Sequence, residues 1–296
     1  MANISRLGFI GLGLMGKPMA GHLLKAGFPL TVHNRSQAAV DELIVAGAKS
    51  APSPKEMAQN ADIVFTCLPD SPDVEQIVLG KDGIIEGARE GLIVVDHSTI
   101  KPATARNIAA ELSTRGIKFL DAPVSGGQLG AQNGTLTIMV GGDADALEKA
   151  KLAMQAYGKS ITHIGASGAG QVAKCCNQIM VAAQMAAMAE LLIFARKADV
   201  DPQKVVAAIK GGAAQCWTLD NKPERLFAGN RQPGFKAHMQ VKDLHIVMDS
   251  AKEFGMPLPA TTVTTNLYDE MLKMGLGDLD NSAVVAVLEN MAGIVL

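Results

Sequence analysis

The sequence predicts an α/β protein in which an N-terminal, Rossmann-type doubly wound sheet is followed by an all-helical C-terminal domain. Short apolar runs alternate with segments of helical periodicity through the first half of the chain, and this alternation is typical of a parallel sheet covered by helices. A glycine-rich turn follows the first apolar run, and strand-like runs almost vanish after residue 165. A chain of 296 residues is long enough for two domains, which we place at 1–165 and 166–296.

Six apolar runs in the N-terminal region are strand candidates, because Gly, Pro or Asp bounds each of them. They cover residues 6–13, 30–34, 62–68, 92–98, 118–124 and 136–142. Four segments between them carry apolar residues at helical spacing: 16–27, 36–47, 71–80 and 101–116. Strands that alternate with helices of this length predict βαβ units, in which consecutive strands run parallel.

The C-terminal region consists of helical segments that Gly and Pro separate. They cover residues 170–198, 202–211, 218–229, 240–255, 259–275 and 279–293. The most apolar stretch, residues 180–195, is shorter than the roughly 20 residues that span a bilayer and contains Gln184 and Glu190. We therefore expect a buried helix in a protein that has no membrane partner.

The composition narrows the class of protein. Hydrophobic residues make up 48% of the chain and charged residues 19%, and the formal net charge is −2. This balance predicts a large core and offers no basic surface for a nucleic acid. The four cysteines form no C-x-x-C pair and the six histidines no H-x-x-x-H pattern, so we expect neither disulfides nor a metal site. A reducing, cytoplasmic location is predicted.

The first predicted strand runs into "FIGLGLMG", which has the pattern G-x-G-x-x-G. In a dinucleotide-binding turn the first glycine permits the tight bend, the second lets the backbone approach a pyrophosphate, and the third allows close packing of helix on strand. Glycine-rich turns also occur for purely local reasons. Between a strand and a helix, however, this turn predicts a dinucleotide site. Its expected cofactor contacts are Gly11, Leu12, Gly13, Leu14, Met15 and Gly16.

The second predicted strand ends in "VHNRS", where an NAD-specific site usually has an Asp or Glu for the ribose hydroxyls. This chain has Asn34, Arg35 and Ser36 instead. An arginine can pair with the 2′-phosphate of NADP, and the neutral side chains beside it can hydrogen-bond to that phosphate. A solvated loop arginine is the alternative. We expect NADPH/NADP as the preferred cofactor and NADH as the weaker one.

Two later stretches suggest a substrate site. "DAPVSGG" ends in a Ser-Gly-Gly turn at residues 125–127, whose hydroxyl and backbone N–H groups suit a carboxylate. "GAGQVAKCCNQ" puts Lys174, Asn177 and Gln178 on one face of a largely apolar helix. A lysine in such a position either takes part in chemistry or extends its aliphatic stem from the buried helix to the surface.

In chain order, four stretches resemble the β-hydroxyacid dehydrogenase family, and the resemblance covers essentially the whole chain: "GFIGLGLMGKPMAGHLLKAG", "DAPVSGG", "GAGQVAKCCNQ" and "QVKDL". That family includes 3-hydroxyisobutyrate dehydrogenases and 2-hydroxy-3-oxopropionate (tartronate semialdehyde) reductases. The C-terminal "GLGDLDNSAVV" is more similar to the second group. The resemblance implies an NADP-binding Rossmann domain and a helical domain for substrate binding and oligomerisation.

The resemblance also implies roles for individual residues. Lys174 matches the family's catalytic lysine, and Lys242 matches a lysine that extends over the nicotinamide. The residues expected at the substrate carboxylate are Ser125, Gly126 and Gly127, and further cofactor contacts are expected at Leu68, Pro69 and Thr99. Many members have Asn four positions after the lysine, where this chain has Gln178, so either Asn177 or Gln178 is expected to orient the substrate. His97 stands where an apolar or small residue is expected, and the sequence gives no reason for it.

The implied reaction is NADPH-dependent reduction of a small carboxylated semialdehyde to its hydroxyacid, or the reverse oxidation. Lys174 would be the acid/base, which requires that burial and a nearby charge such as Lys242 lower its pKa from the usual ~10.4. The favoured substrate is 2-hydroxy-3-oxopropionate, and 3-hydroxyisobutyrate and succinic semialdehyde are alternatives. A non-enzymatic NADP-binding scaffold protein is the competing interpretation. Apolar helical faces predict a homo-oligomer, either a dimer or a tetramer.

Overall fold

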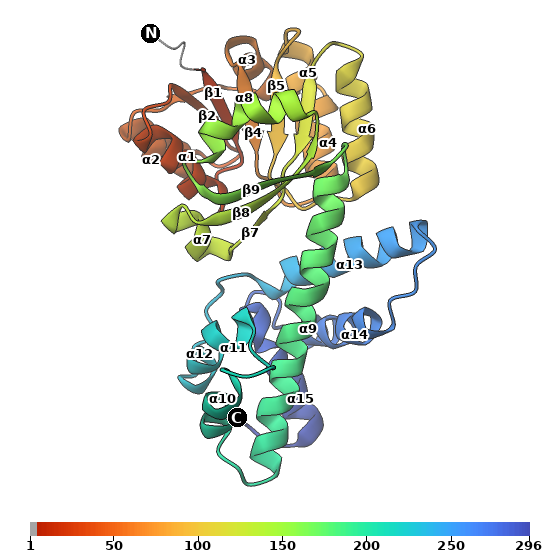
Figure 1. Cartoon of the computed structure of the whole chain (residues 1–296). Coiled ribbons are helices and arrows are strands. Elements are labelled where there is room, and N and C mark those ends of the chain that lie inside the picture. Colours follow the sequence, from red (N-terminus) through yellow and green to blue (C-terminus); the bar gives the residue numbers. More distant parts are fainter. Residues whose placement is uncertain (1–4) are drawn as a thin grey trace. The chain divides into compact units, whose positions relative to one another are not determined.

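The computed structural model describes residues 5–296, which form two compact units. The first unit ends at Lys174 and the second runs from Cys175 to Leu296. This division falls inside one long helix, α9 (Ala169–Lys197), and not at the predicted boundary of residue 165. Figure 1 shows the elements of each unit. The assignment of separate cofactor and substrate roles to two domains stays a prediction.

The first unit is built on one sheet of mostly parallel strands. Its strands are β1 (Leu7–Ile10), β2 (Leu30–His33), β3 (Lys49–Ser50), β4 (Ile63–Thr66), β5 (Ile93–Asp96), β6 (Lys118–Asp121), β7 (Val124–Ser125), β8 (Leu136–Gly142) and β9 (Gly158–Gly165). The order is β3-β2-β1-β4-β5-β6-β8-β7, and β9 pairs with β8. Strands β1 to β6 are parallel, whereas β8 runs antiparallel to β6 and β7. The chain leaves β1 toward β2 on one side and returns to β4 on the other, which is the doubly wound pattern.

Helices cover both faces of this sheet (Figure 1). They are α1 (Gly16–Lys25), α2 (Gln37–Val45), α3 (Pro54–Asn60), α4 (Ser71–Leu79), α5 (Ile84–Gly87), α6 (Pro102–Ser113), α7 (Gly127–Asn133) and α8 (Ala144–Met154). Neighbouring strand residues alternate between two separate cores: Phe9 lies in one and Ile10 in the other, as do Phe65 and Val64. Because both faces are buried there, the central strands β1, β4 and β5 are continuous runs of buried, mainly apolar residues.

The predicted fold class is confirmed, with corrections to the elements. The predicted strand 118–124 is two strands, β6 and β7, and the antiparallel pairing of β8 was not anticipated. Pro123 lies at the break, where its missing N–H prevents a continuous ladder. The prediction missed β3, β9, α3, α5, α7 and α8.

The second unit is helical. Beyond α9 it contains α10 (Pro202–Ile209), α11 (Trp217–Asn221), α12 (Pro223–Phe227), α13 (Ala237–Glu253), α14 (Pro259–Lys273), the 3₁₀ turn η1 (Asn281–Val284) and α15 (Val285–Ala292). The predicted helix 218–229 is divided at Pro223, which begins α12. The 29-residue α9 is long and apolar enough to span a bilayer, but half of its most apolar window is buried. Met185, Met188 and Leu192 lie in the core of this unit, as expected of a buried helix.

A buried ion pair connects three segments of the second unit. The Lys222 ammonium donates to Asp280 at 2.7 Å, and both side chains are almost completely buried. The same carboxylate accepts from the backbone N–H of Gly234 and the hydroxyl of Ser282. Burial lowers the pKa of Lys222, whereas the Lys222 charge holds the pKa of Asp280 below its usual value although burial alone would raise it.

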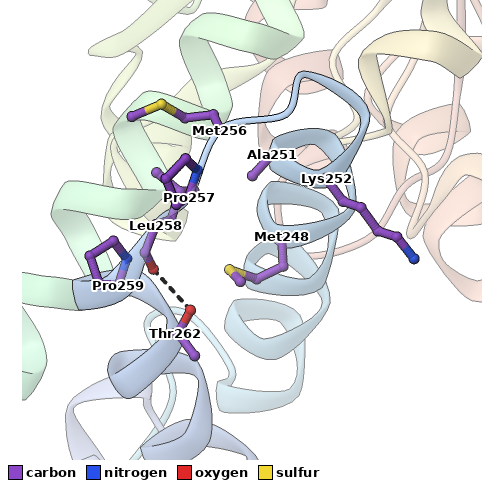
Figure 2. Close-up of a pocket in the computed structure, with 8 residues that line it drawn as sticks. All are labelled: Met248, Ala251, Lys252, Met256, Pro257, Leu258, Pro259 and Thr262. Atoms are coloured by element: carbon purple, nitrogen blue, oxygen red, sulfur yellow. Dashed lines mark hydrogen bonds between the residues drawn. The ribbon is translucent and has the colours of Figure 1, made fainter.

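An open groove lies where α13 ends and α14 begins (Figure 2). It has a volume of about 410 Å³ and a mostly apolar lining. Its lining residues are Met248, Ala251, Lys252, Met256, Pro257, Leu258, Pro259 and Thr262. The Thr262 hydroxyl donates to the carbonyl of Leu258 at 2.9 Å, in addition to the backbone N–H of Thr262, at the start of α14.

Candidate active site

The predicted cofactor residues of the first unit follow the carboxyl ends of parallel strands, whereas Lys242 lies on α13 of the second unit. The glycine loop 11–16 follows β1, residues 34–36 follow β2, residues 67–69 follow β4, and residues 97–99 follow β5. Since these strands are parallel neighbours, their carboxyl ends lie at one edge of the sheet. The boundary between β1 and β4 is the point where the strand order reverses, which is where open α/β sheets bind ligands.

The three glycines of the loop meet different surroundings. Gly11 has φ +93°, and a Cβ there would collide with the carbonyl oxygen of Cys67. A Cβ on Gly16 would collide with the carbonyl oxygen of Gly11. A Cβ on Gly13 would have no heavy atom within 4 Å. The first and third glycines are therefore needed for packing, while the second leaves open space above the loop.

The loop also offers unused hydrogen-bond donors. Among residues 5–296, no group accepts from the backbone N–H of Gly13, Leu14 or Met15, directly before the first turn of α1. N–H groups at a helix start attract anions. The open space at Gly13 and these donors fit the diphosphate of a dinucleotide, so the residues present suit such a cofactor.

At the end of β2 the three predicted side chains have different roles. The Asn34 amide accepts from the N–H of Leu12 at 3.0 Å and donates to the Ser36 hydroxyl at 2.9 Å. Asn34 therefore ties β2 to the glycine loop, a role that the sequence did not reveal. Arg35 is exposed, and no carboxylate in the described part of the chain pairs with it. Its guanidinium is available to an anion.

A buried polar network fixes the loop after β4. The Ser98 hydroxyl accepts from the N–H of Leu68 at 2.8 Å and donates to Asp96 at 2.6 Å. Thr66 donates to the same carboxylate oxygen at 2.7 Å. Leu68 is half-buried and Pro69 exposed beside this network, and Thr99 is half-buried after Ser98. These residues are held at the sheet edge, and their contact with a cofactor stays a prediction.

His97 is explained by its buried environment. Its ring stacks on Phe65 at 5.7 Å, and its two nitrogens bond the Ala122 carbonyl at 2.7 Å and the Tyr157 hydroxyl at 2.8 Å. Since a carbonyl only accepts, Nδ1 carries the proton and Nε2 accepts from tyrosine. Burial lowers the pKa of His97 to about 4. The residue is a neutral structural histidine.

The start of α9 is anchored to the sheet at two points. The Asp121 carboxylate accepts from the N–H groups of Gly168 at 2.7 Å and Gln171 at 2.9 Å, and burial raises its pKa to about 6. The buried Gln171 amide donates to the Ser98 carbonyl at 2.8 Å and accepts from the N–H of Ile100 at 3.1 Å. The sequence prediction did not identify Asp121 or Ser98 as functional positions. Together these contacts fix the helix one turn before the lysine.

Lys174 lies beside the Ser-Gly-Gly turn. Its side chain is buried, with 6% exposure, and its ammonium group donates to the Val124 carbonyl at 2.8 Å. The next residue is Ser125, and Gly126 and Gly127 follow with φ +133° and +61°, values that favour glycine. The first unit thus brings the predicted catalytic lysine next to the predicted carboxylate turn. The snorkelling interpretation does not fit a buried ammonium group.

The other predicted substrate residues form a chain of contacts in the second unit. Asn177 donates to the Gln178 carbonyl oxygen at 2.7 Å, and Gln178 donates to Asp243 at 2.6 Å. Lys242 forms an ion pair with Asp243 at 2.9 Å. The Lys242 charge is therefore paired, a feature that its predicted role over the nicotinamide has to accommodate.

The fold and these residues define the class: a protein that binds a nicotinamide dinucleotide at a doubly wound sheet and holds a buried lysine beside a Ser-Gly-Gly turn. No cluster of three or more His, Cys, Asp or Glu suited to a metal occurs in residues 5–296.

Comparisons with known proteins agree with this class. Residues 6–165 match the NAD binding domain of 6-phosphogluconate dehydrogenase, and residues 168–288 match the NAD-binding family of NADP-dependent 3-hydroxyisobutyrate dehydrogenase. The chain is 42% identical over 287 residues to an uncharacterised oxidoreductase of Shewanella frigidimarina, covering 97% of this chain and 99% of the relative. It is 41% identical over 287 residues to 2-hydroxy-3-oxopropionate reductase of Escherichia coli, covering 97% and 98%.

A solved structure is similar to this chain over nearly its whole length. Mycobacterium tuberculosis 3-hydroxyisobutyrate dehydrogenase with L-serine has a TM-score of 0.89 and 32% identity, covering 97% of this chain and 99% of that chain. The chain belongs to the β-hydroxyacid dehydrogenase family of NAD(P)-dependent oxidoreductases.

Proposed function

We propose that the protein is an NADPH-dependent oxidoreductase that interconverts a small carboxylated semialdehyde and its hydroxyacid, with 2-hydroxy-3-oxopropionate as the favoured substrate. The observation that carries the proposal is the buried Lys174 ammonium group, 2.8 Å from the carbonyl that precedes the Ser-Gly-Gly turn. The 41% identity to a 2-hydroxy-3-oxopropionate reductase supports the choice of substrate.

Each step can be assigned to residues of this chain. A nicotinamide cofactor, when bound at the glycine loop, would supply or accept the hydride. The Ser125 hydroxyl and the backbone N–H groups of Gly126 and Gly127 hold the substrate carboxylate. Lys174 protonates the developing alkoxide in reduction and takes the hydroxyl proton in oxidation. Asn177 or Gln178, about one helical turn further along α9, orients the substrate oxygen.

Lys174→Ala tests the assignment of the acid/base. We expect kcat to fall by at least about 10²-fold, because proton transfer by a positioned group contributes about 10²–10⁴-fold. The dissociation constant for NADPH should stay within a few-fold of wild type. Lys197→Ala, at the exposed end of the same helix, is the matched control and should keep full activity. Wild-type turnover by Lys174→Ala would contradict the assignment.

Arg35 supports the preference for NADPH, because its exposed guanidinium follows β2 where no carboxylate is present to repel a phosphate. Hydrogen bonds to charged groups contribute about 1.5–3 kcal/mol, so Arg35→Glu should lower the NADPH/NADH ratio of kcat/KM by at least about tenfold. Lys25→Glu makes the same charge change at an exposed position of α1 and should leave the NADPH/NADH ratio unchanged. An unchanged ratio in Arg35→Glu would refute the role of Arg35.

Other small carboxylated hydroxyacids and semialdehydes are the alternative substrates. 3-Hydroxyisobutyrate and L-serine appear in the name of a structure with TM-score 0.89. Both, like succinic semialdehyde or its hydroxyacid, carry the carboxylate that the turn would hold. An NADP-binding scaffold protein is the non-enzymatic alternative, and it gives no reason for a buried lysine beside that turn.

The assembly and location are also proposals. The exposed Met180 and Phe194 on α9 support a homodimer or tetramer, since large apolar side chains on a helix surface favour association. The four cysteines of the described chain are all free thiols, which supports a reducing compartment such as the cytoplasm.

A further inference from the structure

The buried Asp243 carboxylate sets the donor–acceptor direction of the hydrogen bonds that connect it to Gln178 and Asn177. Its side chain is 3% exposed, and it contacts two groups, the Lys242 ammonium at 2.9 Å and the Gln178 amide at 2.6 Å. A carboxylate beside an ammonium group can only accept hydrogen bonds. Gln178 must therefore turn its NH₂ group toward Asp243.

This orientation determines the next amide. With its NH₂ directed at Asp243, Gln178 presents its carbonyl oxygen to Asn177, 2.7 Å away. Asn177 must then donate with its own NH₂ group, which leaves its carbonyl oxygen and one N–H for another partner. Gln178 is 3% exposed and uses both ends of its amide inside the protein, whereas Asn177 is only half-buried.

We infer that Asn177 is the amide that contacts the substrate, and that Gln178 and Asp243 are positioning residues that set its orientation. This inference rests on the proposed function and deepens it. The free carbonyl oxygen and N–H of the Asn177 amide, one acceptor and one donor, match a substrate hydroxyl group, which both donates and accepts. Gln178 therefore occupies the position of the family's asparagine without taking its expected role.

A double-mutant cycle on kcat separates this arrangement from direct contact. Asn177→Ala removes the presented amide, and Gln178→Met removes the positioning amide at nearly constant length. If Gln178 acts only through Asn177, Gln178→Met should lower kcat by about tenfold in the wild-type background and by less than about twofold in the Asn177→Ala background, because residues in one network are not additive. Losses that multiply, about 100-fold in the double variant for two tenfold singles, would overturn the inference.

A second measurement does not depend on turnover. The side-chain amide NMR signals of Gln178 and Asn177, assigned from the two single variants, should shift in Asp243→Asn. The control Asp249→Asn removes an exposed carboxylate from the same helix and should leave them in place. Unmoved signals in Asp243→Asn would overturn the inference. Absence of wild-type turnover with every semialdehyde would instead count against the proposed function, and the NMR result would still decide the orientation.

Discussion

Replacing His97 by glutamine should change how the stability of the protein depends on pH. His97 is buried, neutral and bonded to Ala122 and Tyr157, and burial lowers its pKa to about 4 from an ordinary 6.5. A glutamine can donate to the carbonyl and accept from the tyrosine, but it does not titrate. The substitution therefore removes one titration while both hydrogen bonds can be kept.

Whether acid raises or lowers the stability depends on which state, folded or unfolded, binds the proton more tightly. Between pH 6.5 and 4 an unfolded chain protonates His97 while the folded chain does not, so wild-type stability falls as pH decreases. For the pKa pair 6.5 and about 4, the loss between pH 7 and pH 4.5 is about 2.5 kcal/mol. Asp121 opposes it, because its folded pKa is raised to about 6 from 3.8, which stabilises the folded state by about 2 kcal/mol over the same interval. As far as these two groups decide it, the wild-type profile should be nearly level.

Urea unfolding followed by circular dichroism at pH 7 and pH 4.5 tests this. His97→Gln should gain about 2.5 kcal/mol relative to wild type on acidification, because only the Asp121 contribution remains. Parallel profiles for the two proteins would refute the reasoning, as would an NMR titration in which the His97 ring protonates near pH 6.5.

Further predictions follow from the packing of the glycine loop and from the buried ion pair. Gly13→Ala should leave the melting temperature unchanged, since its Cβ meets no heavy atom within 4 Å, but it should weaken NADPH binding at least about tenfold by blocking the approach of the pyrophosphate. Gly16→Ala should instead lower the melting temperature, because its Cβ would collide with the carbonyl oxygen of Gly11. Equal melting temperatures for the two variants would contradict this. Lys222→Met leaves Asp280 as a buried, uncompensated charge and should cost about 3–5 kcal/mol in urea unfolding. The exposed Lys273→Met should cost less than about 1 kcal/mol, and a similar small cost for Lys222→Met would show that the ion pair does not hold the three segments together.

The sequence predicted the elements whose signal is local. Among the predicted strands, β1, β4 and β5 are continuous, mainly apolar runs because the sheet is buried on both faces there. Most side chains of β9 are exposed, so its sequence has no such run, and α5 has only four residues, too few to show periodicity. The antiparallel direction of β8 depends on pairing with β6 over a distance in sequence and has no local signal.

In the candidate site, too, the features with a local sequence signal were predicted and the contacts between distant residues were not. The glycine loop, Arg35 and the Ser-Gly-Gly turn were located from short motifs because each depends on adjacent residues. The contacts that anchor α9 connect Asp121 to Gly168 and Ser98 to Gln171, pairs 47 and 73 residues apart. A single sequence does not reveal such pairings. The buried role of His97 required Tyr157, 60 residues further along the chain.

The most direct test of the account is the loss of NADPH absorbance, with NADH in parallel, in the presence of 2-hydroxy-3-oxopropionate, methylmalonate semialdehyde or succinic semialdehyde. We expect rapid oxidation of NADPH with one of them, slower oxidation of NADH, and the highest kcat/KM for 2-hydroxy-3-oxopropionate. Tight NADPH binding without turnover of any of the three would contradict the proposed reaction and leave the buried Lys174 without its assigned role.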